Sequence, residues 1–130
     1  MFEPELVARL LVTAFFAVAF LQSAIDKLVD RDSNLAYFND HFKNSPLADM
    51  VPLMLKVITA IEATAGGLCT LGLLTFSFRH RGVGVAELGV CVSAFALICL
   101  FFGQRAAKDY AGAAVIAAYF AVALLGLSFF

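Results

Sequence analysis

Charged residues are scarce in this sequence, and tryptophan is absent. Asp, Glu, Lys and Arg make up 15% of the 130 residues, and the formal net charge is −1. Because there is no basic excess to neutralise phosphates, no nucleic-acid partner is expected. Apolar residues dominate instead: 62% of the chain is hydrophobic and the mean hydropathy is +0.92. A soluble domain of this length cannot bury so much apolar surface, so we expect the lipid bilayer to surround it.

Histidine and cysteine are also few, which limits metal and redox chemistry. His41 and His80 both fall in polar joints, so no span supplies the axial histidine pair of an intramembrane haem, or ligands for copper or iron. Cys69, Cys91 and Cys99 lie in apolar runs without a Cys-x-x-Cys pair, which argues against a zinc site or a disulfide framework. We predict no bound metal or haem. Cys69 and Cys91 are close enough in depth to meet as a redox pair, but packing is the favoured interpretation.

The N-terminus lacks the features of a secretory signal. The segment MFEPELVARL has no basic start and no small-residue cleavage site, so the first apolar run is expected to be retained as a membrane span. Pro4 suits the first turn of a helix, and Glu3 and Glu5 suit its positive end. The polar residues that close this span are Gln22, Ser23, Asp26 and Lys27. They form either an ordinary solvated helix end or a functional corner.

Glu62 is the most unusual residue in the chain. Between Val57 and Phe78, the only other ionisable group is the thiol of Cys69. A run of this length is what a helix needs to cross about 30 Å of hydrocarbon, so Glu62 lies inside a predicted transmembrane helix. At helical spacing it shares its face with Thr59, Gly66 and Cys69. We predict that this small and polar stripe faces the interior of a helix bundle.

Four long apolar segments predict four transmembrane helices. The spans are expected at about residues 6–27, 52–78, 82–103 and 109–130. Short joints on both sides of the third span force neighbouring helices to run antiparallel. The predicted fold class is therefore all-α integral membrane, an antiparallel four-helix transmembrane bundle, with residues 1–130 as a single membrane domain. Glu87 lies early in the third span, toward the opposite membrane face from Glu62, and is expected to be a separate feature.

The one long polar stretch, residues 30–50, is too charged to span a membrane. Ser33 can cap a short helix that Pro46 ends, which gives an interfacial segment at about residues 33–45. Its apolar residues recur at i, i+3 and i+7: Leu35, Phe38 and Phe42. We predict a short amphipathic helix on the membrane surface or over the end of the bundle. A plain connecting loop is the alternative.

Polar residues at the ends of three spans are candidates for a site on one side of the membrane. Glu62 lies about six residues after Lys56, on the order of 9 Å deeper, so a lysine at the end of a neighbouring span can reach it. We predict a buried polar cluster of Lys27, Glu62, Lys108, Asp109 and Tyr110. A paired carboxylate is less costly to bury than an isolated one. The cluster serves either to fix helix register or to perform chemistry.

Three segments resemble the DoxX family of small four-helix bacterial membrane proteins. They are Phe20–Leu28 (FLQSAIDKL), Ile61–Leu74 (IEATAGGLCTLGLL) and Lys108–Leu125 (KDYAGAAVIAAYFAVALL). The first departs from the family pattern in having Ala24 where a glycine is expected, although Lys27 is retained. The resemblance covers nearly the whole chain and implies a multi-pass protein of the bacterial inner membrane. It also implies kinship with the small membrane subunit of thiosulfate:quinone oxidoreductase, and so a quinone-proximal cluster.

Three functions are compatible with these features. The favoured one is an accessory, quinone-contacting subunit of a membrane redox or respiratory complex, which binds other subunits or a second copy through its lipid-facing helices. The second is a stand-alone quinone-linked oxidoreductase, related to thiosulfate or oxidative stress, with its quinone site at Lys27, Glu62 and Lys108. The third is a small-solute or proton pathway, for which four short helices offer little room.

Basic residues do not by themselves determine the orientation of the chain. Arg9, Arg79 and Arg81 fall on one side of the predicted membrane, and Lys27, Arg31, Lys43, Arg105 and Lys108 fall on the other. We expect both termini and the compact turn at residues 79–81 to be cytoplasmic, because that turn and the DoxX resemblance outweigh the simple count.

Overall fold

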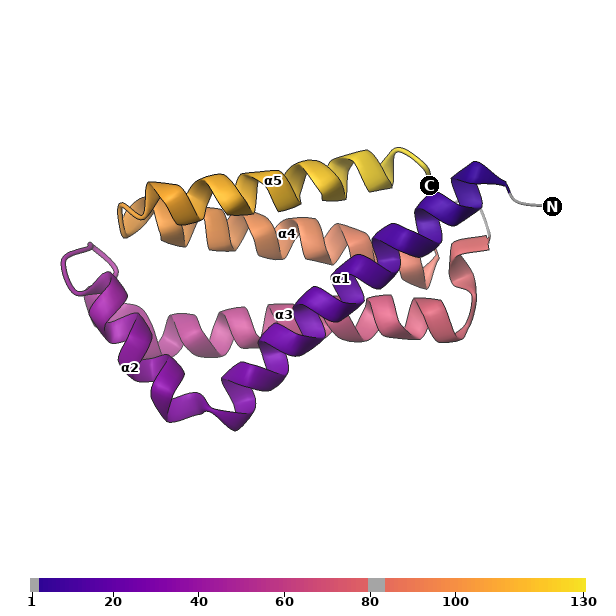
Figure 1. The fold of residues 1–130 in the computed structure, drawn as a ribbon. Coiled ribbons are helices and arrows are strands. Elements are labelled where there is room, and N and C mark those ends of the chain that lie inside the picture. The colour runs from indigo at the N-terminus through magenta and orange to yellow at the C-terminus, as the bar shows by residue number, and fades with distance from the viewer. Residues whose placement is uncertain (1–2, 80–83) are drawn as a thin grey trace.

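The computed structural model describes residues 3–79 and 84–130, which form a bundle of helices joined by short turns (Figure 1). The helices are α1 (Pro4–Val29), α2 (Arg31–Phe42), α3 (Val51–Leu74), α4 (Val85–Ala106) and α5 (Tyr110–Leu127), with 3-10 turns η1 (Ala48–Met50) and η2 (Ser77–Arg79). Helices α1, α3, α4 and α5 are long and apolar enough to cross a membrane. The chain is thus an all-α, multi-pass membrane protein, and the predicted fold class is confirmed.

Helix α1 crosses the other spans obliquely, whereas α4 and α5 run side by side (Figure 1). The main packing partners are α1 with α3, α3 with α4, and α4 with α5. Near its N-terminus α1 also reaches the last turn of α5, where Val12 lies against Gly126. Helix α5 is the least enclosed span, since its buried residues are Ala113, Ala123 and Gly126. Most of its surface is therefore left for lipid or a partner.

Small residues set how closely the spans approach one another. A Cβ atom added to Gly66 of α3 would come 2.7 Å from the backbone nitrogen of Leu21 in α1. A Cβ atom added to Gly89 of α4 would come 2.8 Å from the backbone nitrogen of Cys69 in α3. Such close approach is how membrane helices gain dispersion contacts without a hydrophobic driving force. The core that these contacts enclose includes Phe16, Phe20, Ala65, Val90 and Leu97.

The second span ends earlier than the sequence predicts. Helix α3 stops at Leu74 and not at Phe78, and Phe76 adopts a positive φ of 55°. The turn carries η2 back against α1 and buries Phe78, which is 3% exposed. Burial of this aromatic ring explains why the helix does not continue. The predicted joint at residues 79–81 and the predicted helix start at Gly82 extend into residues outside the described ranges.

Helix α2 follows α1 after one residue, and the predicted cap at Ser33 is wrong. The helix begins at Arg31, so Ser33 lies in its first turn. The side-chain amide of Asn34 instead ties the two helices together by donating to the carbonyl oxygens of Asp26 and Asp30. This arrangement lets the chain turn sharply between α1 and α2 without a separate cap.

The apolar side of α2 covers one end of the bundle. Leu35 and Phe38 are half buried and Phe42 is 7% exposed, as the predicted spacing requires. The ring of Phe42 reaches toward the end of α4, where a Cβ atom on Gly103 would lie 3.5 Å from it. The helix ends at Phe42, before Pro46. Helix α2 therefore lies across the ends of α3 and α4, where the candidate site is found.

Candidate functional site

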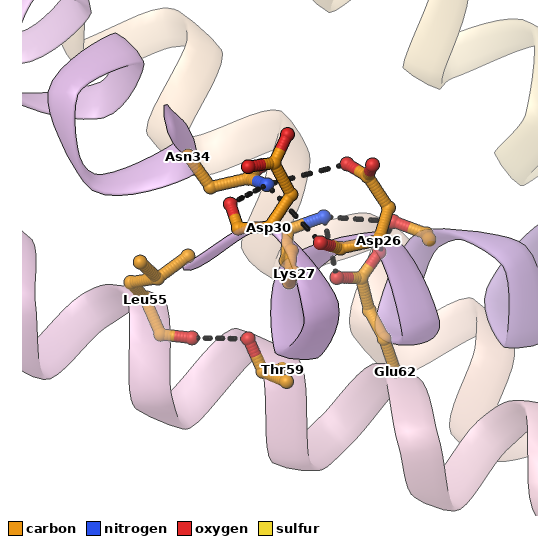
Figure 2. A network of polar contacts seen from close by, with 8 residues as sticks. Asp26, Lys27, Asp30, Asn34, Leu55, Thr59 and Glu62 are labelled. Carbon is orange, nitrogen blue, oxygen red and sulfur yellow. Dashed lines mark hydrogen bonds and ion pairs between the residues drawn. The ribbon is translucent and has the colours of Figure 1, made fainter. Parts of the chain in front are cut away.

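A buried ion pair joins α1 to α3. Lys27 Nζ lies 2.9 Å from Glu62 Oε1, and the two side chains are 10% and 2% exposed. Ser23 Oγ donates a 2.7 Å hydrogen bond to Glu62 Oε2, and Lys27 Nζ donates a 2.7 Å bond to Ser23 Oγ. Figure 2 shows the Lys27 and Glu62 side chains pointing toward each other between their helices. Of the five residues in the predicted cluster, the structure brings these two together.

The packing of α1 on α3 makes this contact possible. Gly66 lies one turn after Glu62, and its close approach to Leu21 brings the polar end of α1 within reach of the carboxylate. Thr59 and Cys69 are buried on the same side of α3. The prediction that this stripe faces the bundle interior is thus confirmed.

Lys27 is the ion-pair partner of Glu62 inside the bundle. Within residues 3–79 and 84–130, Glu62 Oε1 has no hydrogen-bond partner, so its 2.9 Å contact with Lys27 is an ion pair without hydrogen-bond geometry. Loss of such a partner leaves an uncompensated charge in the bundle, which strongly destabilises the fold. The other side of the ammonium group faces the ring of Phe38, 6.0 Å from its centroid. Lys27 therefore connects the buried acid to the aromatic face of α2.

The other three residues of the predicted cluster lie elsewhere. Lys108 and Tyr110 are exposed, and the Tyr110 ring lies 4.7 Å from the Arg105 guanidinium carbon. Asp109 caps α5 by accepting a backbone N–H from the first turn of the helix at 2.9 Å. In the part of the chain that the structure describes, no hydrogen bond or ion pair joins these residues to Glu62. The reason is that α5 packs mainly on α4, away from the α1–α3 contact.

A second polar group lies where α2 meets the end of α4 and the start of α5. His41 Nε2 lies 2.7 Å from Gln104 Oε1 and 3.8 Å from Asp109 Oδ2. Because an amide oxygen can only accept, His41 Nε2 carries the proton in the shorter contact. The Tyr37 ring stacks on His41 with centroids 5.5 Å apart and planes 16° from parallel. The sequence places His41 in a polar joint and gives it no role. Its i+4 spacing from Tyr37 is the sequence feature that indicates the stacking of the two rings.

A groove of about 580 Å³ runs between α2, α3 and α4 beside this polar group. Its walls are mostly apolar and include Phe38, Phe42, Met54, Ile58, Ile61 and Leu100. Exposed apolar side chains border its opening: Leu53, Val57, Ile98 and Phe102. His41 and Gln104 also line it. The groove has the volume of a small-molecule site, and exposed apolar side chains lie along it.

Arg9 is a buried cation that entered the sequence-based predictions only through the orientation of the chain. It is 4% exposed although it lies within the α1 span. Its Nε donates to the carbonyl oxygen of Phe129 at 2.5 Å and its Nη1 to that of Phe78 at 3.4 Å, while Nη2 lies 3.8 Å from a Glu5 carboxylate oxygen. The sequence does contain a signal for this group: Glu5 and Arg9 have opposite charges and lie at i,i+4 spacing at the start of an apolar run. This group closes the opposite end of the bundle from Lys27.

The cysteines do not form the redox pair that was considered. Cys69 is fully buried with its Sγ 3.8 Å from Ser93 Oγ, whereas Cys91 is exposed on α4. The two thiols therefore face different surroundings, and Cys69 packs in the core. Cys99 lines the groove.

Acidic and metal-binding side chains are dispersed over the described residues. Glu87 lies in the first turn of α4, and its Oε2 is buried without a hydrogen-bond partner among residues 3–79 and 84–130. Over the same ranges, no group of three or more His, Cys, Asp or Glu is placed to hold a metal ion. His80 lies outside the described residues. The expectation of no bound metal or haem stays a prediction.

Comparisons with protein families, curated proteins and solved structures find no match in any of the three. The resemblance to the DoxX family therefore stays a prediction that depends on three sequence motifs. The groove and the two polar groups beside it are the features from which a function can be inferred.

Proposed function

We propose that the chain is an accessory subunit of a redox or respiratory complex in the bacterial inner membrane, and that it contacts quinone in the groove between α2, α3 and α4. The groove itself carries this proposal, because it is apolar, has exposed apolar side chains along it and has His41 and Gln104 in its wall. A quinone combines an apolar tail with a ring that bears carbonyl acceptors. It therefore requires an apolar cleft with a few hydrogen-bond donors at one end.

The polar end of the groove offers donors for such a ring. His41 Nε2–H is engaged with Gln104 Oε1, so a small rotation presents it to a quinone carbonyl oxygen. The Gln104 amide adds two further N–H groups. Tyr37, stacked on His41, gives the same wall a flat aromatic surface. The apolar tail then lies along Ile58, Ile61 and Ile98, away from the polar end.

The Lys27–Glu62 pair lies behind the groove wall. Phe38 separates them, since it lines the groove and its ring centroid is 6.0 Å from Lys27 Nζ. The second candidate, a stand-alone oxidoreductase, requires quinone at the pair itself. Both side chains are buried and already paired, which favours the groove. We assign the pair to holding α1 on α3 and thereby supporting the wall.

Photolabelling tests the quinone site directly. Membranes that contain the protein are illuminated with an azido-quinone, and the labelled peptides are identified by mass spectrometry. We expect label in residues 37–42, 54–61 and 98–104, with competition by unmodified quinone. Label concentrated near residues 23–27 would move the site to the ion pair, and label spread evenly over all four spans would contradict a specific site.

Copurification tests the accessory role. The protein is extracted in a mild detergent, cross-linked and analysed by mass spectrometry for stoichiometric neighbours. We expect redox subunits among them, and no quinone reduction by the chain purified alone. Quinone reduction by the isolated chain with a suitable electron donor would favour the stand-alone oxidoreductase.

The orientation is proposed with both termini in the cytoplasm. A reporter fused after Phe130 that is active only in the cytoplasm should then be active, and a periplasm-dependent reporter should be silent. The opposite pair of results would invert the arrangement and place the groove at the cytoplasmic end of the bundle.

A further inference from the structure

A second pocket, of about 240 Å³, lies at the corner where α1, α2 and α3 meet. Its lining includes three cationic side chains, one from each helix: Lys27, Arg31 and Lys56. Among the described residues, no carboxylate lines it. Leu55 appears in the lining of both this pocket and the larger groove. The ligand proposed for this pocket is tested separately from quinone in the groove.

Two of the three cations have no counter-ion. Arg31 and Lys56 are exposed, and over residues 3–79 and 84–130 neither forms an ion pair or a side-chain hydrogen bond. Lys27 also lines the pocket, but its charge is already paired with Glu62. Two uncompensated positive charges at one opening attract an anion.

The nearby acids do not cancel this charge. The Asp26 carboxylate accepts a hydrogen bond from Asn34, and Figure 2 shows Asp26 and Asp30 grouped around Asn34 at the α1–α2 corner. Neither acid lines the pocket. The positive rim of the pocket thus remains available to a ligand.

Below the cations the pocket becomes apolar. Leu28, Leu55, Ala60 and Ala63 line it, together with Thr59. Lys56, Ala60 and Ala63 share one face of α3 at i, i+4 and i+7, so the small side chains leave a furrow that leads from the charge toward the membrane interior. The pocket lies at the end of α1 and the start of α3, where a span meets the water boundary.

We propose that this corner binds the phosphate group of an anionic phospholipid. Arg31 and Lys56 hold the phosphodiester, Lys27 lines the buried side of the pocket, and one acyl chain begins over Ala60 and Ala63. Positive charge at the boundary above an apolar furrow matches the order of groups in a phospholipid. The lipid would connect α1, α2 and α3 at the corner that also positions Lys27.

Lipid titration of the purified, delipidated protein tests this site. Bound lipid is counted by native mass spectrometry during titration with phosphatidylglycerol or with zwitterionic phosphatidylcholine. We expect a clear preference for phosphatidylglycerol, and loss of roughly tenfold or more of that affinity in the double variant Arg31→Gln/Lys56→Gln. The matched control is Lys43→Gln, because Lys43 is an exposed lysine paired with Asp40 and does not line the pocket. It should bind as the wild type does.

A second variant keeps the charges and fills the furrow. Ala60 is exposed, so Ala60→Phe is compatible with folding and should also weaken phosphatidylglycerol binding. Equal binding of both lipids, or unchanged affinity in both variants, would overturn the proposal. Displacement of the lipid by millimolar inorganic phosphate would also overturn it and assign the cations to a soluble phosphate. Azido-quinone labelling should be unchanged in all variants, which keeps this test distinct from that of the groove.

Discussion

Arg9 and Phe129 lie 120 positions apart in the sequence, yet the Arg9 guanidinium donates to the Phe129 carbonyl oxygen at 2.5 Å. The bond connects the first span to the residue after the C-cap of α5. Carbonyl groups at a helix C-terminus lack partners within the helix, and a cation there also meets the negative end of the helix dipole. The Phe130 ring lies 5.8 Å from the same guanidinium carbon. A buried charge thus holds the first and last helices together.

Replacement of Arg9 by methionine should destabilise the bundle. Methionine keeps an apolar stem but leaves the carbonyl groups of Phe129 and Phe78 without their donor. Hydrogen bonds to a charged group contribute about 1.5 to 3 kcal/mol, so we expect a loss of about 2 kcal/mol or more in the free energy of unfolding. Denaturant titration in mixed micelles measures it. Arg105→Met is the control, since Arg105 is exposed and should change stability by less than about 0.5 kcal/mol; equal losses would contradict a closing role for Arg9.

Two substitutions of Glu62 separate packing from chemistry. Glu62→Ala leaves Lys27 only 10% exposed and without its partner, and breaking such a buried pair costs about 3 to 5 kcal/mol. Glu62→Gln keeps the shape and an acceptor for Ser23, and Lys27 can extend toward water, so this variant should fold and insert. Unfolding in detergent is measured beside the activity of the parent complex. Full activity of Glu62→Gln with lowered stability would make Glu62 a register-setting residue, whereas lost activity in a stable variant would give it a chemical role.

Adjacent glycines in α3 provide a matched pair for the α1–α3 contact. A Cβ atom at Gly66 would come 2.7 Å from the Leu21 nitrogen, whereas one at Gly67 would meet nothing within 4 Å. Gly66→Ala should therefore push the helices apart and cost about 1 to 3 kcal/mol, as overpacking does. Gly67→Ala should be neutral or slightly stabilising because alanine favours helix. Comparable stability of the two variants would show that α1 does not approach α3 as closely as this packing requires.

Helical periodicity allowed the face of α3 to be predicted correctly. Thr59, Glu62, Gly66 and Cys69 are small or polar residues at i, i+3 and i+4 spacing, and that spacing determines which of them share a side. The same periodicity placed the apolar residues of α2 on one side. Predictions of this kind depend on neighbours along one helix, which the sequence specifies directly.

The ion-pair partner of Glu62 was harder to predict, because its identity depends on which helices pack against α3. Lys27 and Lys108 both end spans on the predicted side, and nothing local distinguishes them. The packing of α5 on α4 removes Lys108 from the α1–α3 contact. The early end of α3 was missed for a related reason, since the positive φ of Phe76 has no signal in its residue type and results from the burial of Phe78.

The two cysteines of α4, Cys91 and Cys99, provide a test of the quinone groove. Cys99 lines the groove and Cys91, two turns earlier on the same helix, is exposed and does not. Cys99→Phe adds a ring into the open space of the groove, so azido-quinone labelling of residues 54–61 should fall several-fold while stability changes little. Cys91→Phe adds the same ring to a lipid-facing position and should leave labelling unchanged. If both variants label as the wild type does, the groove does not hold the quinone ring. If both lose label equally, the ring acts through the helix as a whole, and the site cannot be assigned to the space beside His41 and Gln104.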